Sequence, residues 1–301
     1  MIKRTLYFGN PARLFLKDNQ LCIELKSDTG TTETKTTPVE DLGMVVIDHP
    51  QITFTSGIIQ ALQENNVALL TCDARHMPQS LLLPLEGNTI QEERYEDQLK
   101  ATEPLKKQLW AQTIAQKIRN QHAVLKKLNL PEGHLERLYQ TVKSGDPGNH
   151  EAQAAAHYWK MIFANENGFY RDRSGPPPNN FLNYGYAILR AVMARSIVCA
   201  GLIPTLGIFH RNRYNAFCLA DDLMEPYRPF VDQVALELFR EFGEVKELEK
   251  VHKAELLKIP AMNVNIEAAS SPLMVAAQRT ATSLVKCFAG ETRKLIYPEL
   301  K

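Results

Sequence analysis

The first 86 residues alternate short apolar runs with polar turn residues. The apolar runs fall at residues 6–8, 13–16, 21–26, 44–48 and 67–72, and turn pairs stand at 10–11 and 18–19. This alternation is typical of β-strands joined by turns. One segment differs, because Ile58 and Leu62 recur at helical spacing after Ser56, which can cap the start of a helix. We therefore predict a β-rich domain at residues 1–86 that contains a single helix.

The pattern becomes helical in the remainder of the chain. Residues 87–102 are polar and charged, and we expect a linker there. Trp110, Ile114 and Ile118 then recur at four-residue spacing, which predicts an amphipathic helix with Lys117 on another face. Asn149 is a good N-cap for a following helix, and further helices are expected at 182–200, after 231 and from 271. The predicted fold class is α+β, with an all-α C-terminal domain at residues 103–301 that is larger than the β-rich domain.

Charge and cysteine usage narrow the class of protein. Lys and Arg number 35 against 34 Asp and Glu, so the net charge of +1 gives no global basic field, and nucleic-acid binding must depend on local patches or a partner. The five cysteines are scattered and lack CxxC spacing, which favours free thiols in a reducing compartment. The longest apolar tract, residues 184–203, contains Arg190 and Arg195 and is interpreted as a buried helix. With no signal peptide at the start, we expect a cytoplasmic protein.

One short segment carries an unusual number of charged groups. Residues 210–232 read HRNRYNAFCLADDLMEPYRPFVD. On a helix, Asp222 and Glu225 stand at i and i+3 and Asp221 and Glu225 at i and i+4, so either pair could share one cation. That cation could be a metal or an arginine. Pro226 predicts a kink or a helix start beside Glu225, and we expect Arg228 and Asp232 to form a structural salt bridge.

Other residues admit both a structural and a functional interpretation. Glu151 falls in the first turn of a predicted helix, where the helix dipole favours any acid. His210 taken alone is more often a core or surface histidine than a metal ligand. The segment 171–180 contains three consecutive prolines, so Arg171 and Arg173 belong either to an ordinary solvated loop or to one that lines DNA.

The charged segment resembles a known signature. Its pattern HxxxxNxFxLADDLMEPYRPxVD is similar to that of the Cas1 family, the CRISPR-associated adaptation integrases, in their type II variety, and two further stretches agree, EAQAAAHYW from Glu151 and NFLNYGYAILR from Asn180. The resemblance covers the whole chain. It implies a β-rich domain used for dimerisation and a helical catalytic domain.

The resemblance also implies a mechanism and a site. Members of this family insert pre-spacer DNA into a CRISPR array by attack of a 3′-hydroxyl on a phosphodiester, without ATP. The implied catalytic residues are Glu151, His210 and Glu225, which with Asp222 would bind Mg²⁺ or Mn²⁺. We expect the first three to lie close together on three different helices, and leave open whether His210 is a ligand or a proton shuttle. Candidate phosphate contacts are Lys160, Arg171, Arg173, Arg190, Arg211 and Arg213.

The implied partners are DNA, a second copy of the chain and the small second Cas adaptation protein in a heterohexamer. The type II effector nuclease and its accessory adaptation protein are further expected partners. The absence of a GxxxxGK[ST] loop, a GxSxG elbow and an HExxH pair leaves ATP-driven and protease chemistry without support. Two alternatives remain: a metal-dependent repair nuclease acting on branched or single-stranded DNA, and a non-enzymatic helical DNA-binding scaffold.

Overall fold

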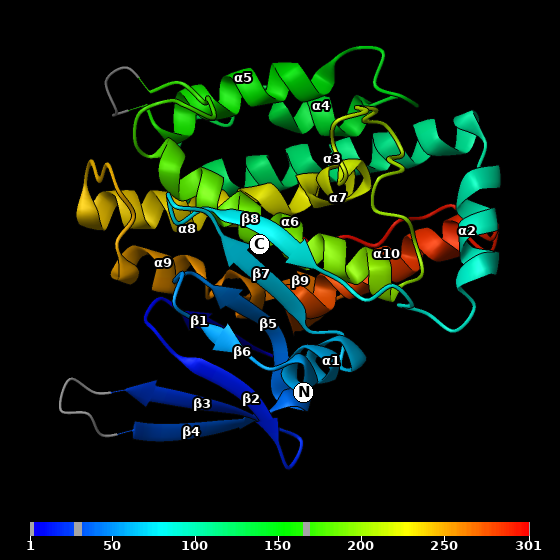
Figure 1. Cartoon of the computed structure of the whole chain (residues 1–301). Helices are drawn as coiled ribbons and strands as arrows, with labels where there is room; N and C mark the ends of the chain where they lie inside the picture. Colours follow the sequence, from blue (N-terminus) through cyan, green and yellow to red (C-terminus); the bar gives the residue numbers. More distant parts are fainter. Residues whose placement is uncertain (1–2, 27–31, 165–168, 301) are drawn as a thin grey trace. The chain divides into compact units, whose positions relative to one another are not determined.

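The chain forms two compact units (Figure 1). The computed structural model describes residues 3–26, 32–164 and 169–300. One unit spans Met1–Gly87 and the other Asn88–Lys301. The strands β1–β8 lie in the first unit and the long helices in the second, so the predicted mixed α+β class is confirmed.

Among its described residues, the first unit contains two four-stranded sheets. One has the order β1 (Arg4–Phe8), β5 (Leu42–Ile47), β7 (Ala68–Cys72), β8 (Pro78–Leu82), and the other β4 (Thr32–Pro38), β3 (Gln20–Lys26), β2 (Arg13–Lys17), β6 (Thr53–Phe54). Strands β1, β5 and β7 are parallel, and every residue of β5 is buried, as expected for a central parallel strand. The helix α1 (Ser56–Glu64) places Ile58 and Leu62 against Leu14, Val45 and Leu69 of the two sheets.

The second unit, over residues 88–164 and 169–300, is a bundle of helices with one short hairpin. Its helices are α2 (Gln91–Lys100), α3 (Glu103–Lys127), α4 (Leu135–Thr141), α5 (His150–Ile162), α6 (Asn179–Cys199), α7 (Cys218–Met224), α8 (Arg228–Phe242), α9 (Lys250–Leu256) and α10 (Leu273–Phe288), with the 3₁₀ turns η2 (Glu225–Tyr227) and η3 (Ile259–Ala261). The hairpin of β9 (Asn263–Ile266) and β10 (Ala269–Pro272) adds strands to a unit that we expected to be entirely helical.

The helix α6 is the centre of this unit. It packs against α7, α8, α9 and α10, and most of its residues are buried, as the apolar tract predicted. Within the described part of the chain, no helix has the length and apolarity needed to cross a membrane. All five cysteines are free; Cys22, Cys218 and Cys287 are buried, and Cys72 and Cys199 are partly buried.

The segment expected to be a linker contains the helix α2 instead. Most of its polar side chains face solvent, but Gln98 is only 2% exposed. The Gln98 amide donates hydrogen bonds to the carbonyl oxygens of Ile203 and Leu206 at 3.1 and 3.2 Å and accepts one from the Ile203 amide at 2.8 Å. A buried polar side chain must be paired in this way. Gln98 therefore holds the loop that leads from α6 to His210.

We predict that Gly185→Ala destabilises the second unit. A Cβ atom at Gly185 of α6 would lie 2.5 Å from Cγ1 of Val231 in α8. The overpacking should lower the free energy of unfolding by about 1–3 kcal/mol, measured by urea denaturation. Gly57→Ala in α1 is the control, because its Cβ would meet only Leu16 at 4.0 Å. Equal effects of the two substitutions would contradict the close approach of α6 and α8.

Candidate active site

Glu151 stands at the beginning of α5. The carboxylate of Asp146 accepts hydrogen bonds from the backbone amides of His150 and Glu151 at 2.9 and 3.0 Å. The side chain of Asn149, which we expected to cap this helix, makes no capping bond. Asn149 adopts a left-handed backbone conformation with φ of 52°, and Asp146 supplies the cap from further back in the turn. Glu151 is thereby fixed in the first turn, with its side chain 26% exposed.

Glu225 stands where the helical path breaks. The helix α7 ends at Met224, and the 3₁₀ turn η2 carries Glu225 and Pro226, which confirms the predicted break at this proline. Glu225 is 5% exposed, and its Oε1 accepts a hydrogen bond from Nε of Arg228 at 2.8 Å. Arg228 is thus paired with Glu225.

The expected ion pair between Arg228 and Asp232 is wrong. The carboxylate of Asp232 is buried and accepts hydrogen bonds from the hydroxyl groups of Tyr158, at 3.0 Å, and Tyr186. The spacing of Arg228 and Asp232 along the helix suggested the ion pair, but tyrosine hydroxyls from two other helices donate hydrogen bonds to the Asp232 carboxylate instead. Burial raises the pKa of Asp232 to about 7, even though both tyrosine hydrogen bonds act to lower it.

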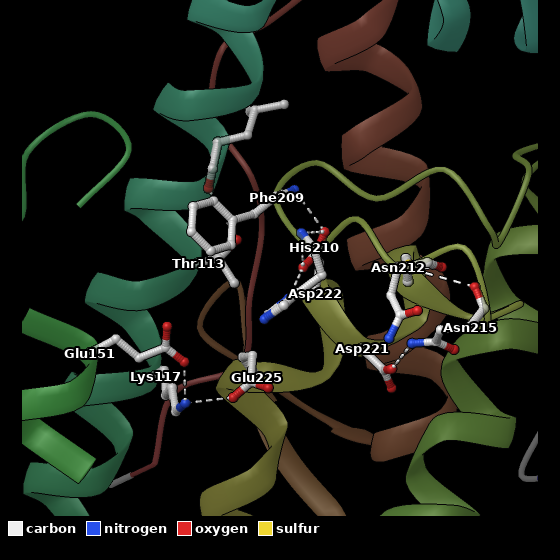
Figure 2. A network of polar contacts seen from close by, with 12 residues as sticks. Thr113, Lys117, Glu151, Phe209, His210, Asn212, Asn215, Asp221, Asp222 and Glu225 are labelled. Carbon is white, nitrogen blue, oxygen red and sulfur yellow. Dashed lines mark hydrogen bonds and ion pairs between the residues drawn. The ribbon is translucent and has the colours of Figure 1, made fainter. Parts of the chain in front are cut away.

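Lys117 of α3 joins the two acids. Its Nζ lies 2.7 Å from Oε1 of Glu151 and 2.6 Å from Oε2 of Glu225. Figure 2 shows the ammonium between the two carboxylates, which come from α5 and η2. Lys117 is only 9% exposed, so the expectation that it faces away from the core is wrong. Its position, three residues after Ile114 and seven after Trp110, was the signal that it shares the buried face.

His210 and Asp222 form a second pair beside the two acids. Nδ1 of His210 is hydrogen-bonded to Oδ1 of Asp222, and Asp222 also accepts from the backbone amides of Phe209 and His210. Asp222 is fully buried. His210 lies on the loop between α6 and α7, which corrects the expectation that it stands on a helix. Its side chain is 46% exposed, so the imidazole is open to a substrate.

The loop that carries His210 is held by close packing. The ring of Phe209 stacks on Trp110 with 4.2 Å between centroids, and His210 meets Trp110 edge-on. A Cβ atom at Gly207 would lie 2.5 Å from the carbonyl oxygen of His210 and 2.7 Å from Oδ2 of Asp222. Gly207 is therefore a residue of the site that the sequence analysis missed, and only its place near the charged segment hinted at its role.

Asp221 and Asp222 have different surroundings. Asp221 accepts hydrogen bonds from Nε of Arg190 and from the amide of Asn215, both at 2.7 Å. It therefore belongs to a surface pair, and its neighbour Asp222 is the acid that contacts His210. Arg190 is held by Asp221, although its side chain remains 45% exposed.

The other candidate phosphate contacts are divided between free and engaged side chains. Lys160 and Arg173 are exposed. Arg171 donates to the side-chain oxygens of Asn179 and Asn183 at 2.8 and 2.9 Å. Arg211 pairs with Glu103, and Arg213 lies over the ring of Tyr214. Arg211, Arg213 and His210 line an open groove of about 520 Å³, which places two of the predicted arginines beside the histidine.

Neighbouring charges fix the protonation state of Glu225. Burial alone would raise the pKa of Glu225, but Arg228 and Lys117 outweigh it and lower the pKa to about 2. Glu225 is thus ionised at neutral pH. The hydrogen bond to Asp222 raises the pKa of His210, with smaller contributions from the charges of Glu225 and Glu151.

The donor set fits a divalent cation, although the present arrangement does not itself form a coordination site. Within residues 3–26, 32–164 and 169–300, no three His, Cys, Asp or Glu side chains are arranged to hold a metal. Two carboxylates nevertheless converge on one positive charge, and Oε2 of Glu225 is buried without a well-formed hydrogen bond. Two carboxylates and an imidazole nitrogen are ligands that suit Mn²⁺ or Mg²⁺. Glu151, Glu225 and His210 are therefore the residues that could hold such an ion.

Solved structures share this fold. A structure titled "Casposase bound to integration product" superposes with a TM-score of 0.79 at 20% identity and covers 98% of this chain and 92% of that one. A "Cas6-RT-Cas1--Cas2 complex" gives a TM-score of 0.73 at 19% identity, over 100% of this chain and 36% of that one. These likenesses show that the chain shares its fold with a casposase and with a chain of a complex that contains Cas1.

The sequence comparisons identify the family. The profile described as "CRISPR associated protein Cas1" matches residues 6–255. The "CRISPR-associated endonuclease Cas1" of Neisseria meningitidis serogroup C (strain 8013) is 36% identical over 296 residues, covering 98% of this chain and 94% of that protein. The chain belongs to the Cas1 family, which confirms the resemblance found in the sequence.

We predict that Asp222→Asn lowers the pKa of His210, whereas Asp221→Asn leaves it unchanged. The first substitution removes the negative charge of the carboxylate that contacts Nδ1 of His210, and the second removes an acid that contacts Arg190. The pKa is measured by NMR titration of the imidazole.

The same pair should make stability depend on pH. A histidine whose pKa is raised by folding stabilises the folded state at pH values below the pKa of an unfolded histidine, and that stability is lost as the pH rises through the raised pKa. The stability lost in Asp222→Asn should therefore be larger at about pH 5.5 than at about pH 9. Equal pKa values in both variants would contradict the pairing.

Proposed function

We propose that this Cas1-family chain, a CRISPR adaptation nuclease and integrase, performs its chemistry where Glu151, Glu225 and His210 meet. The observation that carries the proposal is the convergence of Glu151 and Glu225 on a single ammonium. These acids lie on α5 and η2, far apart in sequence, and the His210–Asp222 pair lies beside them (Figure 2). Two like charges gathered in a partly buried pocket are unfavourable for folding, which supports a functional reason for keeping them.

The proposed ligands of a divalent ion are Glu151, Glu225 and His210. Asp222 would position His210, because its hydrogen bond to Nδ1 sets the ring orientation and leaves Nε2 as the reactive nitrogen. No hydrogen bond involves Nε2 in the part of the chain that the structure describes. When bound, Mg²⁺ or Mn²⁺ would polarise the scissile phosphate and stabilise the leaving oxygen. His210 would either share the ion or move a proton at Nε2.

The proposed reaction is an exchange of phosphodiester bonds. A 3′-hydroxyl of a pre-spacer attacks a phosphorus atom at the edge of a CRISPR repeat, one P–O bond forms and another breaks, and a new 3′-hydroxyl leaves. Bond energy is conserved, so ATP is not needed. With water as the nucleophile, the same residues would hydrolyse DNA, which accounts for endonuclease activity at one site.

The groove beside His210 is the proposed path of the DNA. It carries Arg211 and Arg213, and exposed Lys160 and Arg173 would add phosphate contacts elsewhere on the helical unit. Such contacts position DNA without reading its sequence, and they make binding sensitive to salt. The structural likeness to a casposase bound to an integration product supports this proposal at the level of the fold.

The proposed assembly has more than one copy of the chain. Insertion at two phosphates requires two active sites, and we propose a homodimer formed through residues 1–86, joined to the small second Cas adaptation protein. A complex containing Cas1 and Cas2 among the fold's neighbours supports this partner. The heterohexamer, the effector nuclease and its accessory protein rest on the family resemblance. Endonucleases among the curated relatives favour this function over a scaffold without activity.

We predict that Glu225→Gln reduces DNA integration by about 100-fold or more, because one charged ligand is lost. The assay combines the full chain with Mn²⁺, a DNA fragment with 3′-hydroxyl ends and a plasmid carrying the repeat, and products are resolved on a gel. Glu299→Gln is the control, because this acid is half exposed and contacts only Arg119 among the ion pairs of the described residues.

The control fragment for this assay carries blocked 3′ ends. Products larger than the fragment that vanish on blocking support integration. Shortened DNA alone would favour the repair nuclease, and unchanged products from Glu225→Gln would contradict the proposed site.

A further inference from the structure

Lys117 occupies the point at which the two acids would share an ion. Its Nζ lies 2.7 Å from Glu151 and 2.6 Å from Glu225. Arg228 binds the opposite oxygen of Glu225, Oε1, so Lys117 alone meets Oε2 among the described ion pairs of that acid. The ammonium is therefore the cation that lies between the two acids, and Arg228 contacts the other oxygen of Glu225.

Distance and charge both oppose a second cation at this point. Contacts between an ammonium and a carboxylate are about 2.7–2.9 Å long, whereas Mg²⁺ binds oxygen at about 2.0–2.1 Å. Nζ lies within 2.7 Å of one oxygen of each acid, so an ion placed between these two oxygens would overlap the ammonium. Lys117 and Arg228 already balance the charges of Glu151 and Glu225. A divalent ion added without displacement would leave two excess positive charges.

The lysine side chain is suited to leaving this position. An ammonium is a compact charge on a flexible four-carbon stem, so it can move without disturbing the backbone of α3. An arginine bound by both its nitrogens would be held more rigidly. The Glu151 side chain is 26% exposed, so the displaced ammonium can reach water beside it.

We propose that Lys117 is a built-in competitor of the metal ion. Its ammonium holds Glu151 and Glu225 together in the metal-free protein and leaves them when a divalent ion binds. The inference rests on the proposed function, because it takes these acids to be the metal ligands. It assigns Lys117 the role of a positioning residue that sets the metal affinity and prevents the two acids from repelling each other before the ion arrives.

The test compares Mn²⁺ binding to the full-length wild type, Lys117→Met and Lys126→Met by isothermal titration calorimetry. Lys126 is the matched control, because it is an exposed lysine on the same helix α3. Removal of the competitor should tighten Mn²⁺ binding by about tenfold in Lys117→Met, and Lys126→Met should match the wild type. Unchanged or weaker binding by a folded Lys117→Met would overturn the proposal.

A second measurement needs no substitution and covers the case in which Lys117→Met does not fold. Wild-type protein is treated with formaldehyde and a mild reductant, with and without saturating Mn²⁺, and methylation of each lysine is quantified by mass spectrometry. Lys117, which is 9% exposed, should become several-fold more reactive with Mn²⁺, and the exposed Lys126 should not change. A Lys117 that stays protected at saturating Mn²⁺ would overturn the proposal.

Glu225→Gln separates this inference from the proposed function. Saturable Mn²⁺ binding by the wild type that is lost in Glu225→Gln supports the proposed metal site, whatever Lys117 does. If that site binds Mn²⁺ and Lys117 neither competes nor becomes accessible, only the inference fails. If the wild type binds no Mn²⁺, the proposed function and the inference fail together.

Discussion

The site depends on one constraint: two carboxylates from distant parts of the chain must lie together in a partly buried pocket. Like charges at this separation repel, and burial strengthens the repulsion. The ammonium of Lys117 resolves it, with contacts of 2.7 and 2.6 Å to Glu151 and Glu225. Breaking a buried pair by removing one partner is strongly destabilising, by about 3–5 kcal/mol. The packing of α3 against α5 and η2 therefore includes a charged contact as well as apolar ones.

The surrounding elements serve to place these charges. The break at Pro226 ends α7 and turns Glu225 toward α3, and Arg228 one turn later fixes its second oxygen. Gln98 and Trp110 hold the loop that carries His210, one by hydrogen bonds to its backbone and the other by stacking on Phe209. The imidazole thus remains half exposed and oriented. An active site needs a rigid frame around a group that substrate can reach, and this arrangement supplies both.

The sequence predicted the site residues that lie close to one another along the chain. Glu225, Asp222 and His210 stand within one short segment, and the proline break beside Glu225 follows from the residue type alone. The alternation of the first 86 residues and the apolar stretch of α6 likewise reflect burial patterns that repeat along the chain.

The sequence did not predict hydrogen bonds and ion pairs between side chains that lie far apart along the chain. Lys117 looked like one of several surface lysines, and its burial depends on acids contributed by α5 and η2. Asp232 is satisfied by tyrosines on two other helices, so helical spacing suggested the wrong partner. The segment expected to be a linker contains α2, and Gln98 of this helix is paired with backbone groups about a hundred residues away. The periodic pattern of apolar residues shows which face of a helix is buried, but it does not show which polar groups pair in the folded chain.

The most direct test of the central claim is anomalous diffraction from crystals of the full chain grown with Mn²⁺. The account predicts one strong anomalous peak within ligand distance of Glu151 and Glu225, on the side of Nε2 of His210, with the Lys117 ammonium displaced from between the acids. A peak at a different place, or a lysine still bridging both carboxylates at full Mn²⁺ occupancy, would contradict it.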